Sequence, residues 1–289
     1  MKRCLACRLS FAAEGWRCPA CNFTPENKEG VLVFSPELER DGHGFEERFF
    51  SPLRQVEDGS FWFAARSELI LLFLKRHFPS ARRVLEIGCG TGKVLSALKE
   101  GLPDVDLAGS DVFTRGLSFA AERVPSAFLF QMDARQIPFT EDFDVIGAFD
   151  VLEHIPEDEK VLGEMFRAVR SGGGILLSVP QHEFLWGVVD EYSRHVRRYR
   201  REDLLGKVRA AGFTILGATS FVSLLLPALL IARRIRKQSL ADLDPLAEFR
   251  MGRFPNAMLS GIMGLERALI RSGVSFPAGG SLLVAASRC

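Results

Sequence analysis

Short apolar runs recur along the chain at regular intervals, separated by segments with helical periodicity. The runs are bounded by glycine, aspartate and proline, so they predict buried strands. These strands are expected at residues 83–88, 106–111, 126–133, 143–150, 172–180, 213–219 and 281–288. The clearest helical segments span residues 61–78, 201–211 and 255–271, with further helices after residues 92 and 113 and one reaching Val169. Strand and helix in alternation favour a mostly parallel sheet with helices on both faces.

The same pattern divides the chain into three parts. Residues 1–34 are rich in cysteine and form a unit of their own, and residues 35–80 read as a linker followed by helices. Residues 81–289 carry the strand and helix alternation, with an insertion at about 221–280 between the last two strands.

Composition adds little beyond this picture. The chain has 289 residues, of which 47% are hydrophobic and 25% charged, so it can form a full core. A formal net charge of +1 gives no general reason to expect nucleic acid binding, although it does not exclude a local basic surface. The first residues, MKRCLACR, lack the apolar run of a secretory signal, and we expect a cytoplasmic protein.

Four of the six cysteines lie within the first 21 residues, in two Cys-x-x-Cys pairs. The spacing Cys4-x2-Cys7-x10-Cys18-x2-Cys21 is typical of structural zinc held by four thiolates. A site of this kind is closed and leaves no position for a reacting molecule. We therefore predict a structural Zn²⁺ ion in an N-terminal zinc ribbon.

The segment from Thr214 to Ala232 is almost entirely apolar and is followed by RRIRK. Its length approaches that of a membrane span, but Pro227 interrupts it and a core strand explains its first half. We expect a strand followed by a buried or interfacial helix. Peripheral membrane contact through residues 222–237, with the basic residues at lipid headgroups, is the second hypothesis.

The most specific motif is VLEIGCGTG at residues 84–92. It combines a strand, an acidic residue and the glycines Gly88, Gly90 and Gly92, followed by a helix. Glycines here let the chain turn sharply and let a ligand approach the backbone. The third glycine comes one residue too early for a dinucleotide fingerprint, and no Gly-Lys-Ser/Thr follows as in a Walker loop.

Three acidic residues end the next three strands. Asp111 follows the glycine turn by nineteen residues, where a carboxylate can accept hydrogen bonds from ribose hydroxyls. Asp133 can accept from an adenine amino group, while the backbone N–H of Ala134 can donate to a ring nitrogen. Asp150 ends the fourth strand. Because the carboxyl ends of parallel strands meet at one crevice, these residues should line a nucleotide site together.

These motifs, VLEIGCGTG, GSDVF, QMDARQIPF and FDVIGAFDVLEHI, are similar to the ordered motifs of class I S-adenosylmethionine-dependent methyltransferases. The resemblance covers roughly residues 60–220 and the last strand. It implies a doubly wound α/β Rossmann-like fold with a seven-strand sheet whose final strand inserts antiparallel. It further implies that the methionine portion of the cofactor, its ribose and its adenine are bound in turn by Glu86, Gly88 and Gly90, by Asp111, and by Asp133 with Ala134.

Upstream of these motifs, the segment FWFAAR resembles one that precedes the first motif in many relatives. We expect Arg66 to pair with the carboxylate of the cofactor.

Methyl transfer from a sulfonium needs a positioned nucleophile, and a base only where the acceptor must lose a proton. His154, after the fourth strand, is a candidate, with a structural role as the alternative. The segment DEYSRHVRRYRREDL resembles a lid of bacterial relatives and supplies His195 and Asp190. His182 and Tyr199 are further candidates.

We therefore expect an enzyme that methylates a small-molecule or lipid-like acceptor at oxygen or nitrogen. The ribbon also resembles that of certain ribosomal RNA guanine methyltransferases, so an RNA methyltransferase is the alternative enzyme. A cofactor-binding scaffold is the non-enzyme alternative. The sequence does not indicate an oligomeric state.

Overall fold

A computed structural model describes residues 1–40, 50–235 and 250–289 of the chain. Its strands are β1 (Lys2–Arg3), β2 (Ser10–Phe11), β3 (Glu26–Lys28), β4 (Val31–Val33), β5 (Arg83–Ile87), β6 (Asp106–Asp111), β7 (Phe128–Gln131), β8 (Phe143–Phe149), β9 (Val169–Pro180), β10 (Thr214–Phe221) and β11 (Ser281–Ser287). Its α-helices are α1 (Pro36–Arg40), α2 (Phe50–Glu57), α3 (Phe61–His77), α4 (Lys93–Gly101), α5 (Thr114–Arg123), α6 (Asp158–Ala168), α7 (Val188–Tyr192), α8 (Arg201–Ala210), α9 (Leu226–Ile235) and α10 (Arg253–Arg271).

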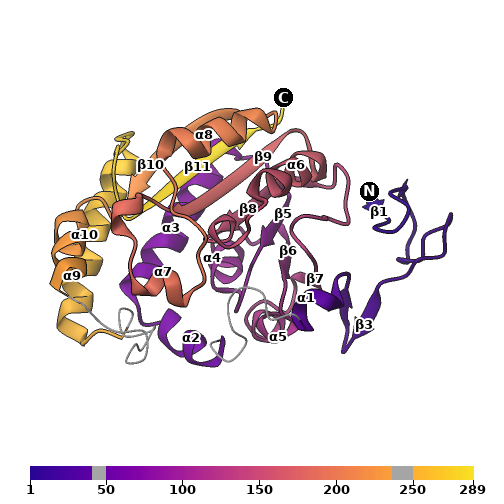
Figure 1. Cartoon of the computed structure of the whole chain (residues 1–289), viewed down its shortest axis with the longest axis horizontal. Helices are drawn as coiled ribbons and strands as arrows, with labels where there is room; N and C mark the ends of the chain where they lie inside the picture. Colours follow the sequence, from indigo (N-terminus) through magenta and orange to yellow (C-terminus); the bar gives the residue numbers. More distant parts are fainter. Residues whose placement is uncertain (41–49, 236–249) are drawn as a thin grey trace.

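Within the described residues, nine strands form one mixed sheet in the order β10-β11-β9-β8-β5-β6-β7-β4-β3. Helices α3, α4, α5 and α10 pack on one face of the sheet, and α6 and α8 pack on the other (Figure 1). Each face has its own cluster of buried apolar side chains beneath these helices. The predicted doubly wound α/β fold with a mostly parallel sheet is therefore confirmed. All seven expected strands belong to it.

Strand β11 lies between β9 and β10 and runs antiparallel to both, as the resemblance implied. Six of its seven residues are buried, because helices cover both faces of the sheet at this point. The chain leaves β10 at Phe221 and returns directly opposite it, since Phe221 pairs with Ser281.

Two features differ from the sequence prediction. The helix expected to reach Val169 ends at Ala168, and β9 begins at Val169 because this β-branched residue pairs with Phe143 of β8. The sheet also has two more strands than the seven expected. The hairpin of β3 and β4 extends it at the β7 edge, where β4 runs parallel to β7. The predicted boundary at residue 34 thus follows a strand of the central sheet.

The apolar segment from Thr214 to Ala232 forms strand β10 and then most of helix α9, which starts at Leu226. Residues 236 and 237, the end of the segment considered for membrane contact, lie outside the described residues. In the part of the chain that the structure describes, no helix combines the length and the apolar character that crossing a bilayer requires.

Candidate cofactor and acceptor site

The turn between β5 and α4 depends on its glycines. Gly88 and Gly92 adopt positive φ angles of 68° and 78°. A Cβ atom on Gly92 would lie 2.9 Å from Cα of Ala120 in α5, so a larger residue would push that helix away. The predicted glycine turn is therefore held at the carboxyl end of the sheet by close packing as well as by its backbone conformation.

Asp111, at the end of β6, lies directly beside this turn. Its Oδ2 accepts a hydrogen bond from the Gly90 N–H at 2.9 Å, and its Oδ1 accepts one from the Phe113 N–H at 3.0 Å. Burial raises the pKa of this carboxyl, and the backbone N–H groups oppose that rise. These bonds fix the side chain at the wall of the cavity, where a ribose could meet it.

Glu86, the acidic residue of the first motif, is buried beneath the turn. Its Oε2 atom has no hydrogen-bond partner among the described residues. Burial raises the pKa of Glu86 to about 8, although nearby Arg66 acts in the opposite direction. A buried carboxyl of this kind is costly without a partner. An ammonium group bound in the cavity would complete it, and the site therefore fits the amino end of S-adenosylmethionine.

Arg66 of α3 and Asp150 after β8 form an ion pair at the same cavity. The guanidinium of Arg66 also lies over the Trp62 ring, 4.8 Å from its centroid. Ser178 donates a hydrogen bond to Asp150 at 3.3 Å. The structure thus brings together two residues that the sequence placed separately, and the Arg66 guanidinium is fixed where a carboxylate could approach it.

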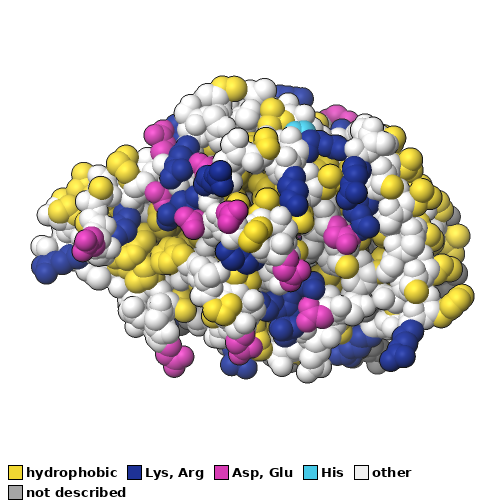
Figure 2. Space-filling view, turned by 180° about the vertical axis from the view of Figure 1, so that it is seen from behind, with side chains coloured by type: hydrophobic (Ala, Val, Ile, Leu, Met, Phe, Trp, Pro, Cys, Tyr) yellow, Lys and Arg dark blue, Asp and Glu magenta, His cyan; other side chains and the backbone are white. Residues whose placement is uncertain are grey.

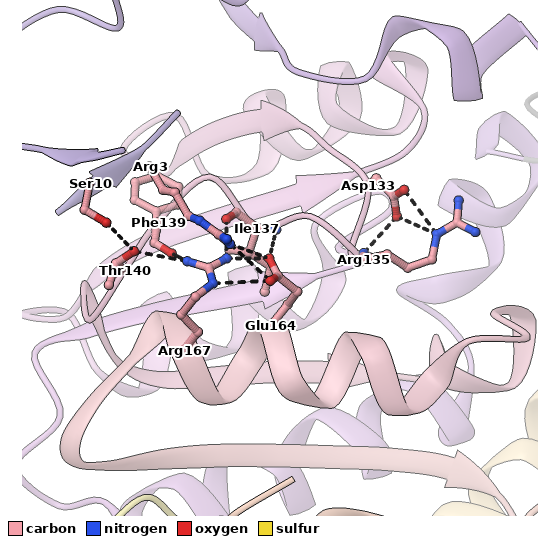
Figure 3. Close-up of polar contacts among 9 residues, drawn as sticks. All are labelled: Arg3, Ser10, Asp133, Arg135, Ile137, Phe139, Thr140, Glu164 and Arg167. Atoms are coloured by element: carbon pink, nitrogen blue, oxygen red, sulfur yellow. Dashed lines mark hydrogen bonds and ion pairs between the residues drawn. The ribbon is translucent and has the colours of Figure 1, made fainter. Parts of the chain in front are cut away.

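Asp133 and Ala134 line the cavity beyond β7. The Asp133 Oδ1 atom accepts hydrogen bonds from the Arg135 backbone N–H at 2.8 Å and from its Nε at 3.0 Å (Figure 3). Nη1 of Arg135 also donates a hydrogen bond to Oε2 of Glu157 at 3.0 Å. The carboxylate is therefore anchored on its own loop before any ligand arrives.

One cavity of about 740 Å³ is lined by Arg66, Glu86, Gly88, Gly90, Asp111, Asp133, Ala134 and Asp150, and it also has an apolar wall. Much of that wall comes from the chain between β10 and β11, including α9 and α10. Its apolar members include Val222, Leu225, Leu229 and Leu259, and Trp62 of α3 lines the same cavity. The cavity thus has a polar, nucleotide-like half and an apolar half.

Two of the three predicted catalytic residues, His154 and His195, line the cavity, and their rings meet edge to face with centroids 4.7 Å apart. Burial, followed by the effect of His195, lowers the pKa of His154 to about 3, so its ring is neutral at neutral pH. Glu153 lies beside them, fully buried, and burial raises its pKa well above the usual value. One ligand atom of each of these three residues falls within 4.8 Å of the others.

Asp190 stands behind this group. Its Oδ1 lies 2.9 Å from Nδ1 of His195 and accepts a hydrogen bond from Nε of Arg198 at 2.8 Å. Asp190 is completely buried and does not line the cavity, so it reaches the cavity only through its contact with His195.

The structure does not bring His182 and Tyr199 to the cavity wall. The His182 ring stacks on Phe184, with centroids 4.7 Å apart, and the Tyr199 hydroxyl donates to Asp158 at 2.7 Å. Conversely, sequence reasoning missed Glu153 and Trp62. Glu153 follows Asp150 by three residues, and this spacing after a buried strand is the signal that could have found it.

The four N-terminal cysteines gather at one point. Sγ of Cys4 lies 3.5 Å from Sγ of Cys21, and Cys7 and Cys18 are 3.6 Å apart. Tetrahedral zinc with Zn–S bonds of about 2.3 Å needs sulfurs roughly 3.8 Å apart, so the group fits a zinc ion.

An exposed apolar surface lies on α9 and α10, outside the apolar half of the cavity. Helices α9 and α10 form the left-hand edge of the molecule in Figure 1. The same edge is at the right in Figure 2, which is seen from behind, and hydrophobic side chains gather along it. Phe254 is 82% exposed, Ile231 59% and Met258 54%. Exposed apolar groups of this size in one place are typical of an interaction surface.

A doubly wound sheet with an acid-lined cavity at a glycine turn defines the class of Rossmann-like nucleotide-binding proteins. Within that class, residues 60–217 match the family described as "Methyltransferase domain". The chain therefore belongs to the methyltransferase-domain family, which confirms the expected class of enzyme.

Among curated proteins, the chain is similar to a phosphatidylethanolamine N-methyltransferase of Cereibacter sphaeroides, at 36% identity over 33% of this chain and 49% of that protein. It is also similar to a trans-aconitate 2-methyltransferase of Variovorax paradoxus, at 30% identity over 36% of this chain and 40% of that one. The chain thus spans less than half the length of these relatives.

Among solved structures, phosphoethanolamine N-methyltransferase 2 of Haemonchus contortus with S-adenosyl-L-methionine has a TM-score of 0.52 at 20% identity, covering 76% of this chain and 52% of that one. The [4+2]-cyclase SpnF has a TM-score of 0.58 at 19% identity, covering 88% and 96%. Because one of these neighbours is described as a cyclase, the shared fold alone does not fix the reaction.

Proposed function

We propose that this protein uses S-adenosylmethionine to methylate an oxygen or nitrogen atom of a small, apolar or lipid-like acceptor. The observation that carries this proposal is the single cavity of about 740 Å³, whose polar half suits the cofactor and whose other half is apolar. Curated relatives described as phosphatidylethanolamine and trans-aconitate methyltransferases support it.

In this proposal the cofactor follows the edge of the sheet. Its amino group meets Glu86 beside Gly88 and Gly90, its carboxylate meets Arg66, and its ribose meets Asp111. Asp133 and the Ala134 N–H hold the adenine. Asp150 keeps Arg66 in place through their ion pair.

The bound cofactor supplies an electrophilic methyl group on a sulfonium. Asp190 fixes the Nδ1–H of His195 and leaves Nε2 able to accept a proton from the acceptor. His154 packs against that ring and stays neutral, and the apolar wall excludes water around the reacting atoms.

The proposal is tested by incubating the purified protein with methyl-labelled S-adenosylmethionine and host extract separated into lipid, small-molecule, RNA and protein fractions. We expect label in the lipid or small-molecule fraction. Label confined to RNA would replace the proposal by the RNA alternative. Cofactor binding without transfer of label to any of the four fractions would favour the scaffold alternative.

The structure gives the RNA alternative little support. Of the basic residues in the ribbon, Lys2 donates to three carbonyl groups of the ribbon itself, at residues 13–15, and Arg3 pairs with Glu164 of the main domain. These charges are therefore engaged within the protein.

We further propose that helices α9 and α10 rest on a membrane surface. Helix α9 lies within residues 222–237, the segment that the sequence indicated for peripheral membrane contact. The apolar residues Ile231, Phe254 and Met258 would enter the headgroup region beside the apolar half of the cavity. Flotation with phosphatidylethanolamine and phosphatidylglycerol vesicles tests this. We expect the double variant F254S/M258S to lose binding, while a control variant at exposed Val196, V196S, keeps it; equal binding would contradict the proposal.

For the ribbon we propose one structural Zn²⁺ ion bound by Cys4, Cys7, Cys18 and Cys21.

A further inference from the structure

The N-terminal ribbon is docked against the main domain at the segment between β7 and β8. Arg3 N–H donates to the Pro138 carbonyl at 2.9 Å, and Thr140 N–H donates to the Met1 carbonyl at 2.8 Å. Lys2 and Phe139 form the antiparallel bridge between these two bonds. Strand β1 of the ribbon thus lies antiparallel beside residues 138–140.

Side chains reinforce this contact. The Trp16 ring meets Phe34 and Phe139 edge to face, at centroid distances of 4.8 and 5.3 Å. Phe139 in turn packs against the core ring of Phe143 at 5.0 Å. Ser10 of the ribbon shares a hydrogen bond of 3.0 Å with Thr140. An apolar anchor with hydrogen bonds around it fixes the ribbon in one orientation.

Glu164 of α6 joins the ribbon to the same segment (Figure 3). Its Oε1 pairs with Arg3 at 3.1 Å, and its Oε2 accepts the Ile137 N–H at 2.8 Å. Arg167 bonds to Glu164 as well and donates to the Ile137 carbonyl at 2.7 Å. Burial alone would raise the pKa of Glu164, but Arg167 and Arg3 together hold it below its usual value. The Glu164 carboxylate therefore stays ionised and binds both arginines and the Ile137 N–H at the same time.

The segment between β7 and β8 begins at the wall of the cavity. Met132, Asp133 and Ala134 line it, and only Arg135 and Gln136 separate them from Ile137. On the opposite side, Gln131 is held by the chain that leaves the ribbon: its Oε1 accepts the Ser35 N–H at 2.9 Å and its Nε2 donates to the Ser35 carbonyl at 2.7 Å.

The N-terminal segment therefore contacts the chain on both sides of this wall, at Gln131 through Ser35 and at Ile137 through Arg3 and Glu164. We propose that the ribbon is part of the cofactor site, and that Arg3 is a positioning residue: through Glu164 it holds the adenine-side loop at residues 132–137 in its binding conformation. Small zinc modules commonly lose their fold without the metal, so we expect removal of zinc to release these contacts and to weaken cofactor binding. This inference rests on the proposed function, because it assumes that adenine binds at Asp133 and Ala134.

The test measures binding of S-adenosylhomocysteine to the full chain by calorimetry. We expect the variant R3A to keep its zinc and its binding stoichiometry but to bind about tenfold more weakly, within the range typical of coupled sites. The conservative variant R3K should recover most of the affinity. The matched control R8A changes an exposed arginine of the same ribbon and should bind like the wild type. Removing zinc with a chelator should weaken binding at least as much as R3A does.

Hydrogen exchange separates positioning from loss of folding. R3A and E164Q, of which the second leaves the ribbon sequence intact, should lose amide protection at residues 132–139 and keep it in β5 and β8. Unchanged affinity in R3A, E164Q and zinc-free protein would overturn the inference while leaving the proposed function standing. A wild-type protein that binds no S-adenosylhomocysteine would overturn both.

Discussion

Binding of S-adenosylhomocysteine should depend steeply on pH because of Glu86. Burial raises the pKa of this carboxyl to about 8 in the free protein, so at pH 7 it is mostly protonated. The ligand's ammonium group requires the ionised carboxylate, and binding must therefore release the proton. With a pKa of about 8, about half of the carboxyl is ionised at pH 8, about a tenth at pH 7 and about a hundredth at pH 6. The affinity should therefore fall roughly fivefold from pH 8 to pH 7, and roughly tenfold more to pH 6, where each pH unit corresponds to about 1.4 kcal/mol.

Calorimetric titrations between pH 6 and pH 9 measure this dependence. Repeating them at pH 7 in buffers with different ionisation enthalpies counts the protons released, and we expect nearly one per ligand. The variant E86Q should bind weakly at every pH and lose the dependence. E122Q, which changes an exposed carboxyl on α5, should retain it. A wild-type affinity that stays flat from pH 6 to pH 9 would refute the assignment of Glu86 to the ammonium group.

Two further predictions concern the other parts of the molecule. Replacing His195 with alanine should slow methyl transfer by about 10²–10⁴-fold, the usual contribution of a general base, and leave the dissociation constant of S-adenosylhomocysteine unchanged; simultaneous loss of turnover and binding would contradict its catalytic role. Purified protein should contain about one zinc per chain by elemental analysis, as a four-cysteine site requires, and the variant C18S should lose it; zinc-free wild-type protein with an ordered ribbon would count against the site.

The strands of the main domain could be predicted because burial on both faces of a parallel sheet makes them continuous apolar runs. The hairpin of β3 and β4 could not, since Glu26–Lys28 is exposed and polar and β4 has only three residues. Its position depends on pairing with β7, nearly a hundred residues away. Local pattern carries no information on that contact.

The same limit applies to the site. Gly88, Asp111 and Asp133 were predictable because each follows a strand whose end reaches the same crevice. The pairing of Arg66 with Asp150 and the contact of His154 with His195 join residues that are distant in sequence, and only the packed structure brings them together. The spacing of Glu153 after the fourth strand could have marked it as a candidate, but its complete burial could not be predicted, because an acidic residue after a strand resembles an ordinary helix start.

The pairing of Phe221 with Ser281 has a consequence for how proteins of this kind diversify. The excursion between them departs and returns at adjacent points of one ladder, so its length and content can change without shifting the register of any strand. The apolar half of the cavity, which we propose for the acceptor, is built partly from this excursion, while the residues that we assign to the cofactor lie outside it. We therefore expect that a chimera in which residues 222–280 are exchanged can change the acceptor specificity and keep the residues assigned to the cofactor. Substitutions and insertions during evolution can act on the same segment in the same way.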